Sequence, residues 1–137
     1  MTIKLLVLCP HNAAKSVAGA AFLTRSAELR GIDLVVATAG TDPDADILPI
    51  VWKRLEADGH AIDEAPTMVT EEMLADADVV INIGCSPTDL PTQRQVRDWD
   101  VPNFSDDPTA AFAALEQAAV AMVAELSYER IRPGAGS

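Results

Sequence analysis

The first sixteen residues constrain the fold of this chain more than any other stretch. The apolar run from Ile3 to Leu8, broken only by Lys4, ends at Cys9, and small or polar residues follow as far as Ser16. Apolar runs of this length are typical of a strand buried on both faces of a parallel sheet. A strand, a tight loop and a helix in this order put the loop at the carboxyl edge of the sheet, where open α/β folds bind ligands.

The chemistry of this loop suggests an anion site. Successive backbone N–H groups at the start of a helix form a concavity that favours negative charge. A helix N-terminus and the nearby Lys15 also favour the thiolate form of Cys9. We therefore interpret Cys9 as a nucleophile beneath a bound oxyanion. The alternative is a structural cysteine, because free cysteines are among the most buried residues.

Composition limits the function classes. The chain has 137 residues, about half of them apolar, which fits one folded domain over residues 1–131 with a flexible tail over 132–137. The net charge of −11 disfavours nucleic acid and an anionic membrane surface. We find no 18-residue apolar span and no basic leader, and expect a soluble cytoplasmic protein. Two cysteines in that setting suggest reduced thiols or a redox pair.

Strand and helix patterns alternate along the chain, which predicts a four-stranded parallel sheet flanked by helices in three layers. The predicted strands are Ile3–Leu8, Ile32–Ala37, Asp78–Ile83 and a short one near Asp100–Phe104; the predicted helices are Ser16–Arg30, Ile47–Asp58, a short one opened by Thr70, a turn over Gln93–Asp98, and a closing helix from Pro108. Asp107 is the predicted N-cap of that last helix. The alternating Asp42, Asp44 and Asp46 lack a complete calcium-loop pattern, so we expect a solvated loop and no metal site.

A family resemblance covers nearly the whole chain. Cys9, Asn12, Lys15 and Ser16 are spaced like the Cys-x-x-Asn-x-x-Arg-Ser signature of the low-molecular-weight tyrosine phosphatase and arsenate reductase superfamily. The segment Thr38-Ala39-Gly40-Thr41 is similar to that family's Ser-Ala-Gly-Thr, and the segments 77–85 and 97–102 are similar to its arsenate reductase half. Lys15 stands where most members have Arg, which resembles the thiol-transferase type of arsenate reductase.

The resemblance implies roles for the loop residues. His11, Asn12, Ala13, Ala14, Lys15 and Ser16 would bind the oxyanion. Ser16 would donate its hydroxyl to the thiolate, or be a simple helix N-cap. Asn12 suits a left-handed backbone conformation. Lys15 supplies charge without the planar fork of Arg, and His11 is either an anion donor or a solvated loop tip.

The general acid and the second thiol are less defined. Where the family has Asp-Pro, this chain has Asn103 and Phe104, and Asn cannot supply a proton. Asp106 is the better candidate acid, since Asp107 is the predicted N-cap. Cys85 resembles the first resolving cysteine of thioredoxin-linked arsenate reductases, but a buried bystander is an equal alternative.

Three hypotheses follow. The first is an arsenate reductase-like enzyme in which Cys9 attacks the oxyanion and Cys85 or an external thiol attacks next, with thioredoxin, glutaredoxin or a low-molecular-weight thiol as reductant. The second is a low-molecular-weight phosphatase that forms a cysteinyl phosphate. The third is a catalytically degenerate protein that binds an oxyanion or senses redox state. No bound cofactor is expected under any of them.

Overall fold

The computed structural model describes residues 2–60, 65–91 and 94–131. Its elements in chain order are β1 (Ile3–Leu8), α1 (Lys15–Arg30), β2 (Leu34–Ala39), α2 (Pro49–Ala57), α3 (Glu71–Asp76), β3 (Val79–Asn82), the 3₁₀ turn η1 (Pro87–Asp89), β4 (Arg97–Asp98) and α4 (Pro108–Ile131). The predicted tail over 132–137 lies outside the described residues.

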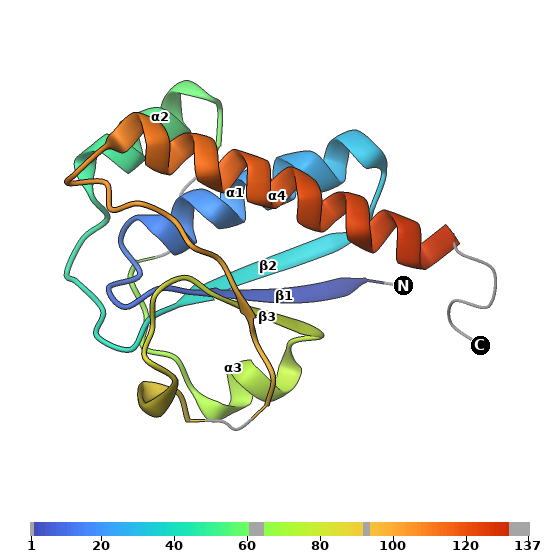
Figure 1. Ribbon diagram of the computed structural model, residues 1–137, viewed down its shortest axis with the longest axis horizontal. Helices are drawn as coiled ribbons and strands as arrows, with labels where there is room; N and C mark the ends of the chain where they lie inside the picture. The colour runs from blue at the N-terminus through green and yellow to red at the C-terminus, as the bar shows by residue number, and fades with distance from the viewer. Residues whose placement is uncertain (1, 61–64, 92–93, 132–137) are drawn as a thin grey trace.

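The four strands form one parallel sheet in the order β2-β1-β3-β4. Helices α1, α2 and α4 lie on one face and α3 lies on the other, as Figure 1 shows. Each face has its own apolar core, because β1 alternates its side chains between them: Leu5 and Val7 belong to the cluster under α1 and α4, while Leu6 and Leu8 belong to the cluster over α3. The three-layer α/β prediction is confirmed.

The helix ends follow the signals in the sequence. Gly31 closes α1 in a left-handed conformation (φ 68°), and its N–H donates to the carbonyls of the last turn. Thr70 Oγ1 accepts the N–H of Met73 at 3.1 Å, so Thr70 is the N-cap of α3. Asp107 accepts the N–H of Ala110 at 3.0 Å, which confirms it as the N-cap of α4.

Two predictions about the fourth strand were wrong. Arg97 and Asp98, expected in a helical turn, form β4 by pairing with the end of β3. Residues 100–104, expected to be the strand, have no regular structure, although Val101 and Phe104 are buried. Their apolar side chains fill the core without any ladder of strand hydrogen bonds, so an apolar pattern was mistaken for a strand. The second strand also begins later than expected, at Leu34, since Ile32 packs ahead of it.

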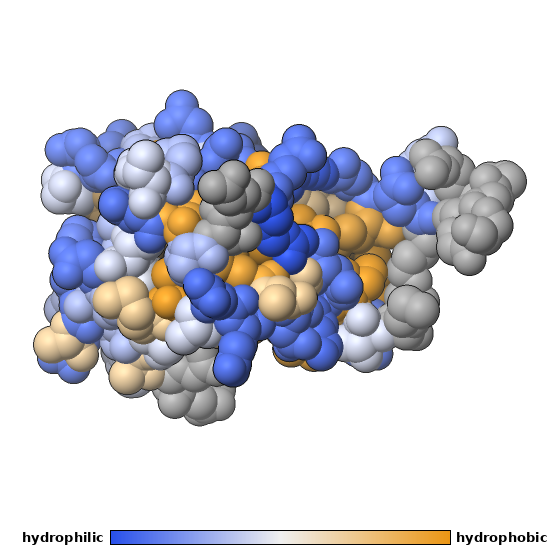
Figure 2. All heavy atoms as spheres, turned by 90° about the horizontal axis from the view of Figure 1, so that it is seen from below, coloured by the Kyte–Doolittle hydropathy of each residue, from blue (hydrophilic) through white to orange (hydrophobic). Residues whose placement is uncertain are grey.

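The last helix corrects a statement about composition. Between Pro108 and Glu129, α4 is long and apolar enough to cross a membrane by length and composition alone, whereas no such span was expected. Its larger apolar side chains Leu115, Met122 and Val123 are buried in the core that also contains α1. Packing within the domain therefore accounts for part of the apolar character of α4, while Val120 on the same helix is exposed. Figure 2, viewed from the α3 side, shows apolar surface in separate patches among hydrophilic residues.

Candidate active site

The loop between β1 and α1, residues 9–14 (the Cys9 loop), has its carbonyl groups tied to a neighbouring segment. Three of them accept N–H groups from the residues that follow β2: Pro10 from Asp42 at 2.7 Å, His11 from Asp44 at 3.0 Å and Ala13 from Leu48 at 2.9 Å. In a trans peptide the carbonyl and the next N–H point in opposite directions, and the described chain has no cis peptide. The N–H groups of residues 11, 12 and 14 therefore point away from the 42–48 segment.

These N–H groups are uncommitted. Within the described residues, the amides of residues 11 to 15 donate to no protein acceptor, although most backbone N–H groups in folded proteins are paired. We call these five N–H groups the amide cup. They precede and begin α1, so the helix dipole adds positive potential in the same place. The arrangement has the donors and the electrostatics of an oxyanion site.

Asn12 holds the Cys9 loop in shape. Its backbone is left-handed (φ 49°), as expected from the sequence, and the residue is 1% exposed. The carboxamide oxygen accepts the Thr67 N–H at 3.0 Å, and Nδ2 donates to Ser16 Oγ at 2.8 Å. Asn12 therefore uses its side chain to anchor the loop from outside and leaves the amide cup free.

Cys9 and Ser16 form the buried base of the site. The Cys9 thiol donates to Ser16 Oγ at 3.0 Å, and the Ser16 N–H donates to Sγ at 3.3 Å. Because Asn12 donates to Ser16 Oγ, the hydroxyl proton of Ser16 is free to turn toward sulfur once Cys9 ionises. A Cys9 thiolate would then accept two hydrogen bonds from one residue.

Gly40, which follows β2, is required by the close approach of the Cys9 loop. A Cβ at this position would lie 2.5 Å from the Pro10 carbonyl oxygen and 2.7 Å from that of Cys9. Both contacts are with backbone, which cannot swing aside. The glycine of the segment 38–41 is thus a steric requirement of the loop, a role that its sequence position alone did not reveal.

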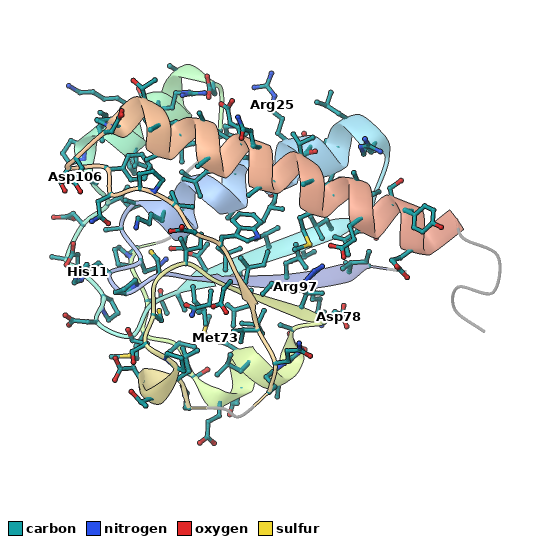
Figure 3. All side chains as sticks on the ribbon, viewed as in Figure 1. His11, Arg25, Met73, Asp78, Arg97 and Asp106 are labelled. Atoms are coloured by element: carbon teal, nitrogen blue, oxygen red, sulfur yellow. The ribbon has the colours of Figure 1, made fainter. Side chains whose placement is uncertain are left out.

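The segment before α4 closes over the start of α1. Lys15 Nζ donates to Asn103 Oδ1 at 2.9 Å, and the Asn103 carbonyl accepts the N–H groups of Asp106 and Asp107 at 3.1 Å each. Asn103 is thus brought to the site. Asp106 is exposed and lies at the same end of the molecule as His11 in Figure 3. Within the described residues no hydrogen bond joins its carboxylate to the Cys9 loop, so its role as an acid stays a prediction.

His11 is oriented by the segment that follows β2. Its Nδ1 lies 3.0 Å from the Asp42 carbonyl oxygen, 3.4 Å from an Asp44 carboxylate oxygen and 3.8 Å from one of Asp42. A carbonyl only accepts, so we assign the ring proton to Nδ1. The ring is exposed and faces acidic groups, and we expect it to link the loop to residues 42–44. Among the described residues, Asp42, Asp44 and Asp46 belong to no cluster arranged to hold a metal ion.

Cys85 lies at the same sheet edge, in the turn after β3. The buried Asn82 side chain accepts the Cys85 N–H at 3.0 Å and donates to the Cys85 carbonyl at 2.9 Å and to Asp98 at 3.2 Å. Burial raises the pKa of the Cys85 thiol, and the negative charge of Cys9 raises it further, while the Thr41 hydroxyl at 3.8 Å opposes the shift. Cys85 is thus close enough to Cys9 to be influenced by its charge, and both are free thiols.

The two cysteines pack into different cores. Cys9 belongs to the cluster that includes α1 and α4, and Cys85 to the cluster on the α3 face. Sequence reasoning identified both thiols but missed Asn82 and Thr67, whose contacts at the site depend on tertiary structure.

Comparison with known proteins identifies relatives of this chain. A protein of Halobacterium salinarum described as a "Putative arsenate reductase" is 31% identical over 111 residues, which cover 78% of this chain and 75% of that protein. The arsenate reductase of Archaeoglobus fulgidus has a similar structure, with a TM-score of 0.73 and 26% identity over 88% of this chain and 98% of that one.

Two further structures show the shared fold. A thioredoxin-dependent arsenate reductase of Corynebacterium glutamicum has a TM-score of 0.76 at 24% identity over 92% of this chain, which spans 62% of that protein. A low molecular weight protein tyrosine phosphatase of Bacillus subtilis has a TM-score of 0.80 at 18% identity, over 93% of this chain and 99% of that one. A sequence model of the low molecular weight phosphotyrosine protein phosphatase family matches residues 4–98. The chain belongs to this family.

Proposed function

We propose that this protein is an arsenate reductase in which Cys9 is the nucleophile. The observation that carries the proposal is the amide cup: five consecutive N–H groups without protein acceptors, at a helix N-terminus, in the loop that begins with a buried thiol. A tetrahedral oxyanion offers the acceptors that these donors lack. Lys15 adds a positive charge at the same helix start.

The reaction takes two steps at sulfur. The Cys9 thiolate attacks arsenic, an S–As bond forms, and one arsenate oxygen leaves as water after protonation. The Cys85 thiolate then attacks Cys9 sulfur, which forms the Cys9–Cys85 disulfide and leaves the S–As electron pair on arsenic, so arsenate is released as arsenite. An external dithiol, of the thioredoxin or glutaredoxin class, or a low-molecular-weight thiol, reduces the disulfide.

The residues near Lys15 favour reduction over ester hydrolysis. Asn103, whose Oδ1 accepts from Lys15, has a side chain that cannot protonate the leaving oxygen of a phosphate ester. In arsenate reduction the leaving group is water, and solvent can supply the proton that it needs. This reaction therefore depends less on a side-chain acid than ester hydrolysis does. Cys85 supports the same choice because a second thiol close to Cys9 has no use in ester hydrolysis.

A phosphatase activity is the second candidate. The matched family is described by its phosphotyrosine phosphatases, and a cysteinyl phosphate on Cys9 would use the same amide cup. We expect it to be slow, because Lys15 grips the equatorial oxygens less well than an Arg fork, and among the described residues no hydrogen bond joins the Asp106 carboxylate to the Cys9 loop.

The discriminating experiment measures arsenate-dependent NADPH oxidation with thioredoxin and glutaredoxin systems in parallel, beside hydrolysis of an aryl phosphate. We expect arsenate turnover that Cys9→Ser abolishes, and aryl phosphate turnover that is much lower. Loss of the thioredoxin-coupled rate in Cys85→Ser would identify Cys85 as the resolving thiol. Phosphate binding without turnover of either substrate would overturn the proposal in favour of an oxyanion-binding protein.

A further inference from the structure

The segment that follows β2 contacts both of the loops that contain a cysteine. Figure 1 shows the segments after β1, β2 and β3 at the same end of the sheet. On one side, the Asp42 N–H donates to the Pro10 carbonyl of the Cys9 loop at 2.7 Å. On the other side, the hydroxyl of the half-buried Thr41 donates to Cys85 Sγ at 3.8 Å. Thr41 thus links the second thiol to the segment that supports the first.

The other surroundings of Cys85 oppose the ionisation of its thiol. Cys85 is 5% exposed, and burial raises the pKa of the thiol, as do the negative charges of Cys9 and Asp89. The Thr41 hydroxyl and N–H act in the opposite direction and lower this pKa. The Asn82 side chain holds the turn through the Cys85 N–H and carbonyl, which are backbone groups. Thr41 therefore supplies the donors that favour ionised sulfur.

The second step of the proposed reductase requires ionised Cys85. The thiol must lose its proton to solvent before its sulfur attacks Cys9 sulfur; the S–S bond then forms, the S–As bond breaks, and the electron pair stays on arsenic. A neutral thiol is a weak acceptor, whereas hydrogen bonds to a charged acceptor are roughly twice as strong as neutral ones. The bond from Thr41 therefore gains strength as Cys85 loses its proton.

These contacts assign a role to Thr41 within the proposed reductase function, on which the assignment rests. We propose that Thr41 is the positioning residue of Cys85: its hydroxyl orients the sulfur and stabilises the thiolate that attacks Cys9. Thr41 takes no proton and touches no substrate, so its effect should be confined to the second step. Oxyanion binding and the first attack by Cys9 should proceed without it.

An aromatic disulfide reagent, dithiobisnitrobenzoate, reproduces the second attack without arsenate. With one equivalent of reagent, Cys9 forms a mixed disulfide and releases one coloured thiolate, and Cys85 then attacks Cys9 sulfur and releases a second. We expect two releases from the natural protein and one from Cys85→Ser. Thr41→Val keeps the shape of the side chain without the hydroxyl. It should slow the second release by roughly threefold to tenfold and leave the first unchanged.

Three further variants separate the hydroxyl from a purely structural effect. Thr41→Ser keeps the hydroxyl and should restore the natural rate of the second release. Thr41→Ala removes the hydroxyl with a smaller side chain and should reproduce the slow second release if valine packs poorly. Thr24→Val is the matched control, because the Thr24 hydroxyl donates to the Ala20 carbonyl within α1 at 2.9 Å. Both releases should be unchanged in it.

A titration of the single thiol in Cys9→Ser tests the ionisation directly. The chain has two cysteines, so the ultraviolet absorbance of the thiolate then reports Cys85 alone. Adding Thr41→Val should move the titration to higher pH, and adding Thr41→Ser should not. Equal titration of these variants, an equal second release in Thr41→Val, or a single release from the natural protein would each overturn the proposal. Absent arsenate turnover beside an intact effect of Thr41 would instead overturn the proposed function.

Discussion

The two loops at the carboxyl edge of the sheet, one after β1 and one after β3, use the same residue types in opposite ways. Each contains a buried cysteine, is organised by a buried asparagine, and has one residue with positive φ: Asn12 (49°) in the first and Gly84 (94°) in the second. In the Cys9 loop, the asparagine side chain bonds to Thr67 and Ser16, and the loop amides stay free. In the turn after β3, the Asn82 side chain takes up both backbone groups of Cys85.

This difference separates a ligand site from a closed turn. A strand followed by a small-residue loop brings backbone donors to the sheet edge in both cases. The two loops differ in what the asparagine side chain bonds to. Asn12 bonds to Thr67 and Ser16, outside the Cys9 loop, whereas Asn82 bonds to both backbone groups of Cys85 within the turn and also to Asp98. The local chemistry follows, since Cys9 has two potential donors on Ser16, and Cys85 is a buried thiol with a raised pKa.

The cysteine exchanges should produce the largest contrast between the two loops. Cys9→Ser should lower arsenate turnover by roughly 10⁴-fold or more, because a neutral hydroxyl replaces the nucleophile. Cys85→Ser should leave phosphate affinity and any aryl phosphate cleavage unchanged and affect only the step that forms a disulfide. Steady-state rates and calorimetric titration with phosphate measure both effects. A Cys85→Ser variant that fails to bind phosphate would mean that the loops are not independent.

The asparagine exchanges should give the next contrast. Asn12→Ala removes both anchors and the left-handed preference, so we expect phosphate affinity to fall by roughly tenfold or more. Asn82→Ala leaves the Cys85 N–H and carbonyl without partners and should lower the free energy of unfolding by about 2–3 kcal/mol, with little change in phosphate affinity. Urea unfolding and phosphate titration of both variants would show whether the two effects separate in this way.

The sequence predicted the first loop better than the second, for a physical reason. The Cys9 loop is bounded by a long apolar strand and a long helix, and the resemblance that implies the role of Ser16 rests on a signature of eight residues. Asn82 acts partly through Asp98, which lies on a strand of two residues that has no pattern of its own. A strand this short is defined by the strand that it pairs with, and the sequence alone does not reveal that pairing.

Contacts across the chain set a similar limit. In the sequence, Gly40 could be recognised only as part of a family resemblance. The reason that this position must lack a Cβ is the close approach of the Cys9 and Pro10 carbonyl oxygens, some thirty residues earlier in the chain. The link from Lys15 to Asn103 spans the domain in the same way. Helices and strands could be predicted from local sequence patterns, whereas the shape of the site depends on contacts between residues far apart in the chain.

The glycine exchanges test the two loops by steric means. Gly40→Ala forces its Cβ against two backbone oxygens, so we expect a loss of about 1–3 kcal/mol in the free energy of unfolding together with weaker phosphate binding. Gly84→Ala meets only an ordinary contact of 3.8 Å with Pro10, and its cost should be the strain of positive φ, about 1–2 kcal/mol, without loss of phosphate affinity.

Gly31→Ala is the control for the strain term in these exchanges. It has φ 68° with no atom within 4 Å of an added Cβ, so it reports the cost of positive φ alone. We expect its free energy of unfolding to resemble that of Gly84→Ala. Phosphate affinity that falls equally in the Gly40 and Gly84 variants would contradict the assignment of Gly40 as the support of the Cys9 loop.

The smallest expected effect is the pH dependence that comes from Cys85. Its pKa is raised in the folded state by burial and then by the charge of Cys9. The unfolded chain therefore ionises first, so this contribution to stability is complete below the ordinary thiol pKa of about 8.5 and is lost as pH rises through the folded value. Urea unfolding between pH 7.5 and 10 should show a decline in the free energy of unfolding that is smaller in Cys85→Ser.

In Cys9→Ser the part of this decline that comes from Cys85 should persist in reduced size, because burial remains while the neighbouring charge is gone. An unchanged decline in Cys85→Ser would assign it to other groups and remove the evidence that Cys85 is kept protonated.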